Sequence, residues 1–276
     1  MGLVEKMIKI DSRWLWLVLL LAFVIPVLNP IGLPIRISNE THVLYDHIRA
    51  LPEGSVVAFD VTYPYAYLTE MEPAVTAVTA HLFTLPVKVV FWSLTVEGPL
   101  VTMVTLEKVK AEIEKYGKKY GEDYVVLGYV PGEETAMAAL MTDTQHVVSS
   151  DYFGNSIDTL PLMTKVRNSR DMRFLICVSV LQADEKVRQY FLKGGLTWAA
   201  IVTTGWIPGY RPFVEAKQIL TALGGLRGGA EYETLTGRIA RGAAYMDVMS
   251  STHLTTVAAA IVANILFLYQ RGRSKR

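Results

Sequence analysis

Residues 55–94 read SVVAFDVTYPYAYLTEMEPAVTAVTAHLFTLPVKVVFWSL, and this stretch decides the fold class. Two apolar runs of strand length, 55–61 and 87–94, enclose an apolar run of helical length at 72–85. Both short runs are rich in β-branched and aromatic residues and do not alternate with polar ones, which is typical of strands buried on both faces of a parallel sheet. The stretch therefore predicts a β-α-β unit.

The same rhythm continues along the chain. Three more strand-length runs occur at 124–130, 174–180 and 198–204, and the remaining predicted helices are 41–51, 99–120, 133–148, 184–194 and 213–223. Alternating strands and helices predict an α/β domain with an open, mostly parallel, doubly wound sheet of the Rossmann-like or flavodoxin-like kind.

A hydrophobic segment lies at each end of the chain. Residues 14–33 contain no charge, and about 20 helical residues match a hydrocarbon core about 30 Å thick. Residues 254–270 form the second segment. We predict that two transmembrane helices flank the domain. A cleaved signal peptide is the alternative for the first segment, but no small-residue cleavage site follows its apolar run.

Basic residues flank the outer side of both segments, which puts both termini in the cytoplasm by the positive-inside rule. These residues are Lys6, Lys9, Arg13, Arg271, Arg273, Lys275 and Arg276. We therefore expect a two-pass plasma-membrane protein with a cytoplasmic tail at 1–13 and a cytoplasmic basic tail at 271–276. Between the spans lie an extracytoplasmic domain at 34–231 and a helical connector at 232–253.

Small and polar residues near the second segment indicate close helix packing. Gly224 and Gly228, and likewise Gly225 and Gly229, are spaced four apart, so in a helix they form a smooth face. In a loop they would instead supply positive φ angles. Asn264 lies inside the apolar segment and is expected to face another helix. That helix is either the first segment of this chain or a segment of another subunit.

The predicted carboxyl ends of the strands are acidic and aromatic. Asp60, Tyr63, Trp92, Ser93 and Glu97 are the candidates for a ligand rim, because ligands of open α/β sheets bind at this edge. Asp60 is the best of them, since an acid that closes the first strand lies near the point where the strand order reverses. A rim of this kind is also what a solvated loop edge looks like.

Motifs for catalysis, metals and cofactors are missing from the sequence. Ser93 and Ser179 are the positional candidates for a nucleophile, but GxSxG is absent and no histidine follows a predicted strand. HExxH, GxGxxG and a phosphate loop are absent, and Cys177 is the single cysteine. We predict no catalytic residue, no metal site and no cofactor. The net charge of +1 gives no reason to expect a nucleic-acid partner.

Three runs carry a resemblance to known proteins: LGGLRGGAEYE at 223–233, DYVVLGYVPG at 123–132 and LPLMTKVRNSRD at 160–171. With the two terminal segments, they make the chain similar to an uncharacterised family of prokaryotic membrane-anchored α/β proteins. The resemblance implies the architecture and no activity, cofactor or site residue.

The leading functional hypothesis is a non-enzymatic scaffold or accessory subunit of a membrane assembly, with lipid and either copies of itself or other membrane subunits as partners. It rests on the missing catalytic residues, on Asn264 and on the glycine face. The alternative is an extracytoplasmic small-ligand-binding or sensory domain. A serine-type hydrolase using Ser93 or Ser179 is the third.

Overall fold

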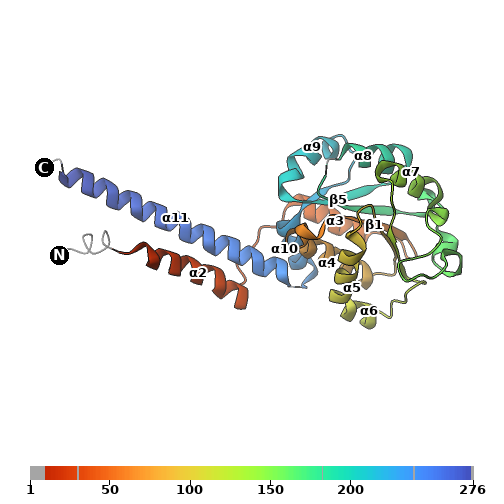
Figure 1. Ribbon diagram of the computed structural model, residues 1–276, viewed down its shortest axis with the longest axis horizontal. Coiled ribbons are helices and arrows are strands. Elements are labelled where there is room, and N and C mark those ends of the chain that lie inside the picture. Colours follow the sequence, from red (N-terminus) through yellow and green to blue (C-terminus); the bar gives the residue numbers. More distant parts are fainter. Residues whose placement is uncertain (1–9, 30, 182, 239, 275–276) are drawn as a thin grey trace. The chain divides into compact units, whose positions relative to one another are not determined.

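The computed structural model describes residues 10–29, 31–181, 183–238 and 240–274 (Figure 1). Contacts divide the chain into two units. Ile35–Gly242 form the α/β unit, and Met1–Pro34 with Ala243–Arg276 form the terminal unit. The α/β unit extends past the expected boundary at 231, because Tyr232 and Glu233 are buried. The first part of the expected connector thus belongs to the domain.

The α/β unit is built on an open sheet of six parallel strands in the order β3-β2-β1-β4-β5-β6. The strands are β1 (Val56–Thr62), β2 (Lys88–Ser93), β3 (Tyr124–Tyr129), β4 (Phe174–Ser179), β5 (Trp198–Val202) and β6 (Ala222–Gly224). The order is that of a Rossmann-like doubly wound fold, and its direction reverses between β1 and β4. The predicted fold class is confirmed for this unit.

Helices cover both faces of the sheet. Those with bounds in the α/β unit are α3 (Asn39–Arg49), α4 (Leu68–Thr84), α5 (Gly98–Lys108), α6 (Lys110–Lys115), α7 (Glu133–Asp143), α8 (Asp184–Lys186) with the π-helix Val187–Lys193 after it, α9 (Ile207–Glu215) and α10 (Gly225–Thr236). Along β1, Val57 and Phe59 pack among α3, α4, α5 and α10, whereas Ala58 faces the core shared by α7, the π-helix and α9. This alternation follows from the two-residue period of a strand.

The sixth strand was not predicted. Residues 213–223 were expected to be one helix. Instead α9 ends at Glu215, Lys217 adopts a positive φ of 58°, and β6 pairs with β5 immediately before α10. Three residues are too few to show a strand pattern, so the apolar residues 219–223 resemble the end of a helix.

In the terminal unit, the first apolar segment forms α2 (Ser12–Leu28), a helix of 17 residues. It was expected to continue to residue 33, but the helix ends at Leu28, and Asn29 takes an extended conformation. The reason is the Asn29-Pro30 pair, because a residue before proline is driven out of the α region. At 1.5 Å per residue α2 is about 25 Å long.

The second apolar segment is part of a longer helix, α11 (Arg241–Ser274), which begins within the expected connector. Residues 241–272 of α11 form the one helix in the described part of the chain that is long and apolar enough to span a membrane. Of the flanking basic residues, Lys6, Lys9, Lys275 and Arg276 lie outside the described residues, as does the side chain of Arg273.

Polar contacts within the terminal unit join its two segments. The Ser251 hydroxyl donates to the Ala22 carbonyl of α2 at 2.6 Å. Asp247 accepts the backbone N–H groups of Gly32 and Leu33 at 2.8 and 2.9 Å. Asn264, in contrast, donates to the Ala260 carbonyl of its own helix at 2.8 Å. Its amide therefore finds an acceptor without a second helix.

Candidate functional site

The expected ligand rim lies at the carboxyl edge of the sheet, but four of its five residues are buried. Asp60, Tyr63, Trp92 and Ser93 expose at most 1% of their surface. Asp60 and Trp92 are register partners on β1 and β2, so the sheet does bring them together. These four side chains are core residues beneath the rim.

Gly98, the first residue of α5, closes the carboxyl ends of β1 and β2. A Cβ atom on Gly98 would lie 1.8 Å from the Ser93 Oγ and 2.4 Å from the Val61 carbonyl oxygen. Only a residue without a side chain allows the helix to begin this close to the strands. The space in which a ligand of an open α/β sheet would contact Ser93 is thus filled by backbone.

Carboxylates on the exposed part of this edge hold loops in place. Glu97 accepts the Tyr65 backbone N–H at 2.5 Å, and Glu70 accepts the Thr204 backbone N–H at 2.8 Å. Each contact satisfies a backbone donor that secondary structure leaves free. Glu97, the fifth expected rim residue, therefore has a structural role in the loop after β1.

Asp60 is the centre of a buried polar cluster at the point where the strand order reverses. Its carboxylate accepts hydrogen bonds from Tyr190 at 2.7 Å, from the Cys177 thiol at 3.3 Å and from Thr62. Burial raises the pKa of Asp60, and these donors together with the nearby charge of Lys186 oppose that rise. The cluster is closed, since all five side chains expose 5% or less of their surface.

The two serines expected as nucleophiles have no base as a hydrogen-bond partner among the described residues. Ser93 donates to the Thr95 carbonyl at 3.0 Å and contacts the Thr95 hydroxyl at 3.2 Å. Ser179 accepts the Leu181 backbone N–H at 3.1 Å. A hydrolase requires a base within hydrogen-bond reach of its nucleophile, so this geometry does not support the hydrolase hypothesis.

The glycine run packs inside the α/β unit. A Cβ atom on Gly229 would lie 2.6 Å from the Ala74 backbone nitrogen of α4, and one on Gly225 would lie 2.8 Å from the Glu70 Cγ. A Cβ atom on Gly228 would lie 3.0 Å from the Leu223 Cβ, and one on Gly224 would make only ordinary contacts, the nearest at 3.4 Å to Ile207. The smooth face expected to meet a partner is therefore covered by α4 of the same chain.

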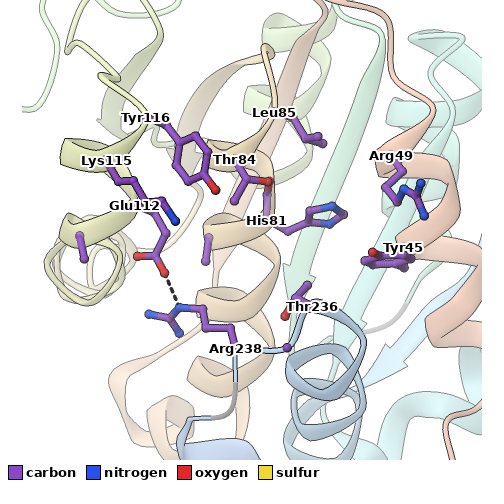
Figure 2. Close-up of a pocket in the computed structure, with 13 residues that line it drawn as sticks. Tyr45, Arg49, His81, Thr84, Leu85, Glu112, Lys115, Tyr116, Thr236 and Arg238 are labelled. Carbon is purple, nitrogen blue, oxygen red and sulfur yellow. Dashed lines mark hydrogen bonds and ion pairs between the residues drawn. The ribbon is translucent and has the colours of Figure 1, made fainter.

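A cleft of the α/β unit lies at the opposite, amino edge of the sheet; we call it the amino-edge cleft (Figure 2). It encloses about 550 Å³ between the last turns of α3, α4 and α10 and the length of α6. Figure 2 shows Glu112, Lys115 and Tyr116 on one wall and Tyr45 and Arg49 on the other. His81 and Thr84 of α4 lie between these walls, and Thr236 and Arg238 close one end.

Cationic side chains outnumber carboxylates in this cleft. Arg238 pairs with Glu112, with 2.6 Å between Nε and Oε1, and also donates to the Lys108 carbonyl at 2.9 Å. Arg49 and Lys115 form no ion pair with a described residue; they lie over the rings of Tyr45 and Tyr116 at 5.7 and 5.3 Å. Helix C-termini attract cations, which explains their position. Glu112 remains the single carboxylate of the lining.

Two polar groups in the cleft bear on what it could bind. The Oε2 atom of Glu112 is buried and has no hydrogen-bond partner among the described residues. His81 contacts the Tyr232 hydroxyl through Nδ1 at 2.7 Å and stacks on Tyr45, with 4.9 Å between ring centroids. Burial and the charge of Arg49 lower the pKa of His81 to about 4, so its ring is neutral at pH 7.

The His81 ring makes the stability of the domain depend on pH. Its folded pKa of about 4 is below the unfolded value of 6.5, so between these values the unfolded state binds more protons and stability falls as the pH falls. From pH 7 to pH 5 we expect a loss of about 2 kcal/mol in the free energy of unfolding. Urea titrations of the full chain and of His81→Gln measure this loss.

The control is the same change at His146, whose side chain is 69% exposed. His146→Gln is expected to keep the difference between pH 7 and pH 5, whereas His81→Gln removes the part of it that His81 contributes. Equal losses in the two variants would rule out His81 as the group responsible.

Sequence reasoning missed the amino-edge cleft entirely. Its cations lie at helix ends and in the turn after α10, where they look like ordinary surface residues; the one usable signal was the set of basic residues in last helical turns. Among the described residues, no group of three or more His, Cys, Asp or Glu side chains is arranged to hold a metal ion.

Comparison with known proteins adds no family to this geometry. No protein-family model, no curated protein and no solved structure matches the chain, so the resemblance carried by 123–132, 160–171 and 223–233 remains an expectation.

Proposed function

We propose that this chain is a membrane-tethered binding domain that holds a small organic acid in the amino-edge cleft. The observation that carries the proposal is the chemistry of the lining, in which Arg49 and Lys115 lack a carboxylate partner among the described residues and the buried Glu112 Oε2 lacks a donor there. Pockets of 300–1,000 Å³ hold small molecules, and this one measures about 550 Å³.

The three groups define the ligand. A carboxylate or phosphate group would pair with Arg49 or Lys115, since charge-assisted hydrogen bonds are the strong ones. A flat or apolar part fits beside the rings of Tyr45 and Tyr116, and a hydroxyl or ammonium group would donate to Glu112. We therefore expect a small acid that also carries a donor, as hydroxy acids and amino acids do.

Calorimetry on the full chain in uncharged detergent tests the proposal with 4-hydroxybenzoate, benzoate and phenol as probes. We expect 4-hydroxybenzoate to bind most tightly, benzoate less tightly because it lacks the donor for Glu112, and phenol least because it lacks the acid. Arg49→Gln should weaken 4-hydroxybenzoate binding at least about 10-fold, the equivalent of about 1.4 kcal/mol.

The matched control is Arg211→Gln, which removes an exposed arginine of α9 outside the cleft. The same amount of probe enters the detergent micelle with both variants, so any difference between their affinities for the probe arises in the cleft. Phenol binding as tightly as 4-hydroxybenzoate, or equal affinities in the two variants, would contradict the proposal.

The proposed arrangement in the membrane has two spans. α11 meets the length and hydropathy criteria for a span, and we place α2 beside it in the bilayer because the contacts of Ser251 and Asp247 join the two segments. The basic flanks put both termini in the cytoplasm and the α/β unit outside. Protease added to intact cells should then cleave the α/β unit. Protection of the unit would contradict this orientation and place the unit in the cytoplasm.

The scaffold hypothesis ranks second, because the residues that suggested a partner subunit already have contacts within this chain. It rested partly on Asn264 and on the glycine face, and each of these has a partner within the chain: the Ala260 carbonyl for Asn264 and α4 for Gly225 and Gly229. The amino-edge cleft, in contrast, contains groups that no residue of the described chain satisfies. Ligand binding therefore ranks first.

A further inference from the structure

A second cavity, distinct from the amino-edge cleft, lies where the chain enters β4 and β5; we call it the β4–β5 pocket. It encloses about 490 Å³ and is formed by the turn before β4, the end of the π-helix with the turn that follows it, and one residue of α3. The side chains that matter here are those of His47, Arg170, Arg173 and Lys193.

The charge of this pocket is of one sign. Arg170, Arg173 and Lys193 form no ion pair among the described residues, and the lining contains no carboxylate. Asp171, the acid between the two arginines, is engaged by the turn, since its Oδ2 accepts the backbone N–H groups of Arg167 and Asn168 at 2.8 and 3.3 Å. Three exposed cations therefore line one pocket without an ion-pair partner among the described residues.

His47 adds a polar atom that lacks a partner. Its Nε2 is buried and makes no hydrogen bond with a described residue, and its ring lies against Phe174 with 4.5 Å between centroids. Burial, and then the charge of Arg173, lower the pKa of His47. The lowered pKa favours the neutral form of the ring, and its Nε2 is still without a hydrogen-bond partner among the described residues.

We infer that the β4–β5 pocket binds a phosphate-type oxyanion, either dissolved or as the headgroup of a lipid. Arginine is the side chain best matched to such a group, because its planar fork offers two parallel N–H donors to two oxygens. Lys193 supplies a third positive charge and His47 a neutral hydrogen-bonding group. The inference stands apart from the proposed function, since the two cavities share no lining residue.

Inorganic phosphate is the probe, and the imidazole C–H signals of His47 in the full chain are the readout. Bound anion offsets the charge of Arg173, so saturating phosphate should move the His47 titration to higher pH. Phosphate should also bind at least about 10-fold more weakly to the double variant Arg170→Gln/Arg173→Gln than to the unchanged chain.

Arg167→Gln is the matched control, because Arg167 is an exposed arginine of the same segment that does not line the pocket. It should keep the phosphate affinity and the shift of the His47 titration. Equal losses in Arg167→Gln and in the double variant would reduce the effect to general surface charge and overturn the inference.

Two lipid compositions distinguish the sources of the phosphate group. In nanodiscs of phosphatidylcholine alone, a His47 response to added inorganic phosphate identifies a dissolved ligand. A response that appears only when phosphatidic acid replaces part of the lipid identifies a headgroup. If the His47 signal responds to neither, the pocket is not an oxyanion site.

Discussion

Replacing Asp60 with alanine is expected to lower the free energy of unfolding of the α/β unit by about 3–5 kcal/mol, several times the contribution of one neutral hydrogen bond. The carboxylate is fully buried and accepts hydrogen bonds from Tyr190, Cys177 and Thr62. Alanine leaves these three donors without that acceptor at a fully buried position. Urea unfolding of the full chain in detergent, followed by tryptophan fluorescence, measures the loss.

Asparagine at the same position separates the two carboxyl oxygens. Asp60→Asn keeps an oxygen that accepts the Tyr190 hydroxyl but replaces the other oxygen with an amide nitrogen, so we expect its stability to lie between those of the wild type and Asp60→Ala. If Asp60→Ala unfolds at the same urea concentration as the wild type, the cluster contributes nothing to stability, and its burial needs another explanation.

Replacing Gly229 with leucine is expected to cost about 3 kcal/mol, because the new side chain enters the contact between α4 and α10. Even a single Cβ at this position would lie 2.6 Å from the Ala74 nitrogen and 2.8 Å from the Pro73 carbonyl carbon. Both are backbone atoms of a helix, so neither is able to rotate away as a side chain would. The expected shift in melting temperature is a decrease of roughly 6–12 °C.

Gly209→Leu is the matched control for this change. Gly209 also lies in a helix, α9, but its nearest neighbour to an added Cβ is the Trp206 ring at 3.6 Å, an ordinary contact. Leucine there should be neutral or slightly stabilising, since glycine costs about 1 kcal/mol in a helix. Similar losses at the two positions would indicate that the α4–α10 contact tolerates added volume.

The sequence predicts the buried strands well, because continuous β-branched and aromatic runs identify strands covered on both faces. It misses β6 because Ala222–Gly224 is only three residues long, too short to form such a run, and owes its conformation to pairing with β5. It also extends the first apolar helix to residue 33, although Asn29 precedes a proline and ends α2 at Leu28. Hydropathy alone contains no information about that backbone restriction.

The candidate sites were harder to predict, because they depend on which groups tertiary packing leaves unsatisfied. The sequence places Ser93 at the end of β2 correctly, whereas Asp60 lies inside β1, two residues before its end at Thr62. It does not reveal that Gly98 brings α5 down onto Ser93 and Val61. The amino-edge cleft is lined by Arg49 of α3, Lys115 of α6 and Arg238 after α10. No local pattern relates residues this distant, since only the strand order brings their helices together.

The hydrogen bonds from Gly32 and Leu33 to Asp247 span 215 and 214 positions of the chain. During synthesis Gly32 leaves the ribosome before any strand of the α/β unit exists, whereas Asp247 follows only after the last one. Domains fold as units while the chain is still being made, so this contact closes only after every strand of the α/β unit has been synthesised. A chain that ends before Asp247 lacks this acceptor, so the two backbone donors of its first segment lose the carboxylate that holds them.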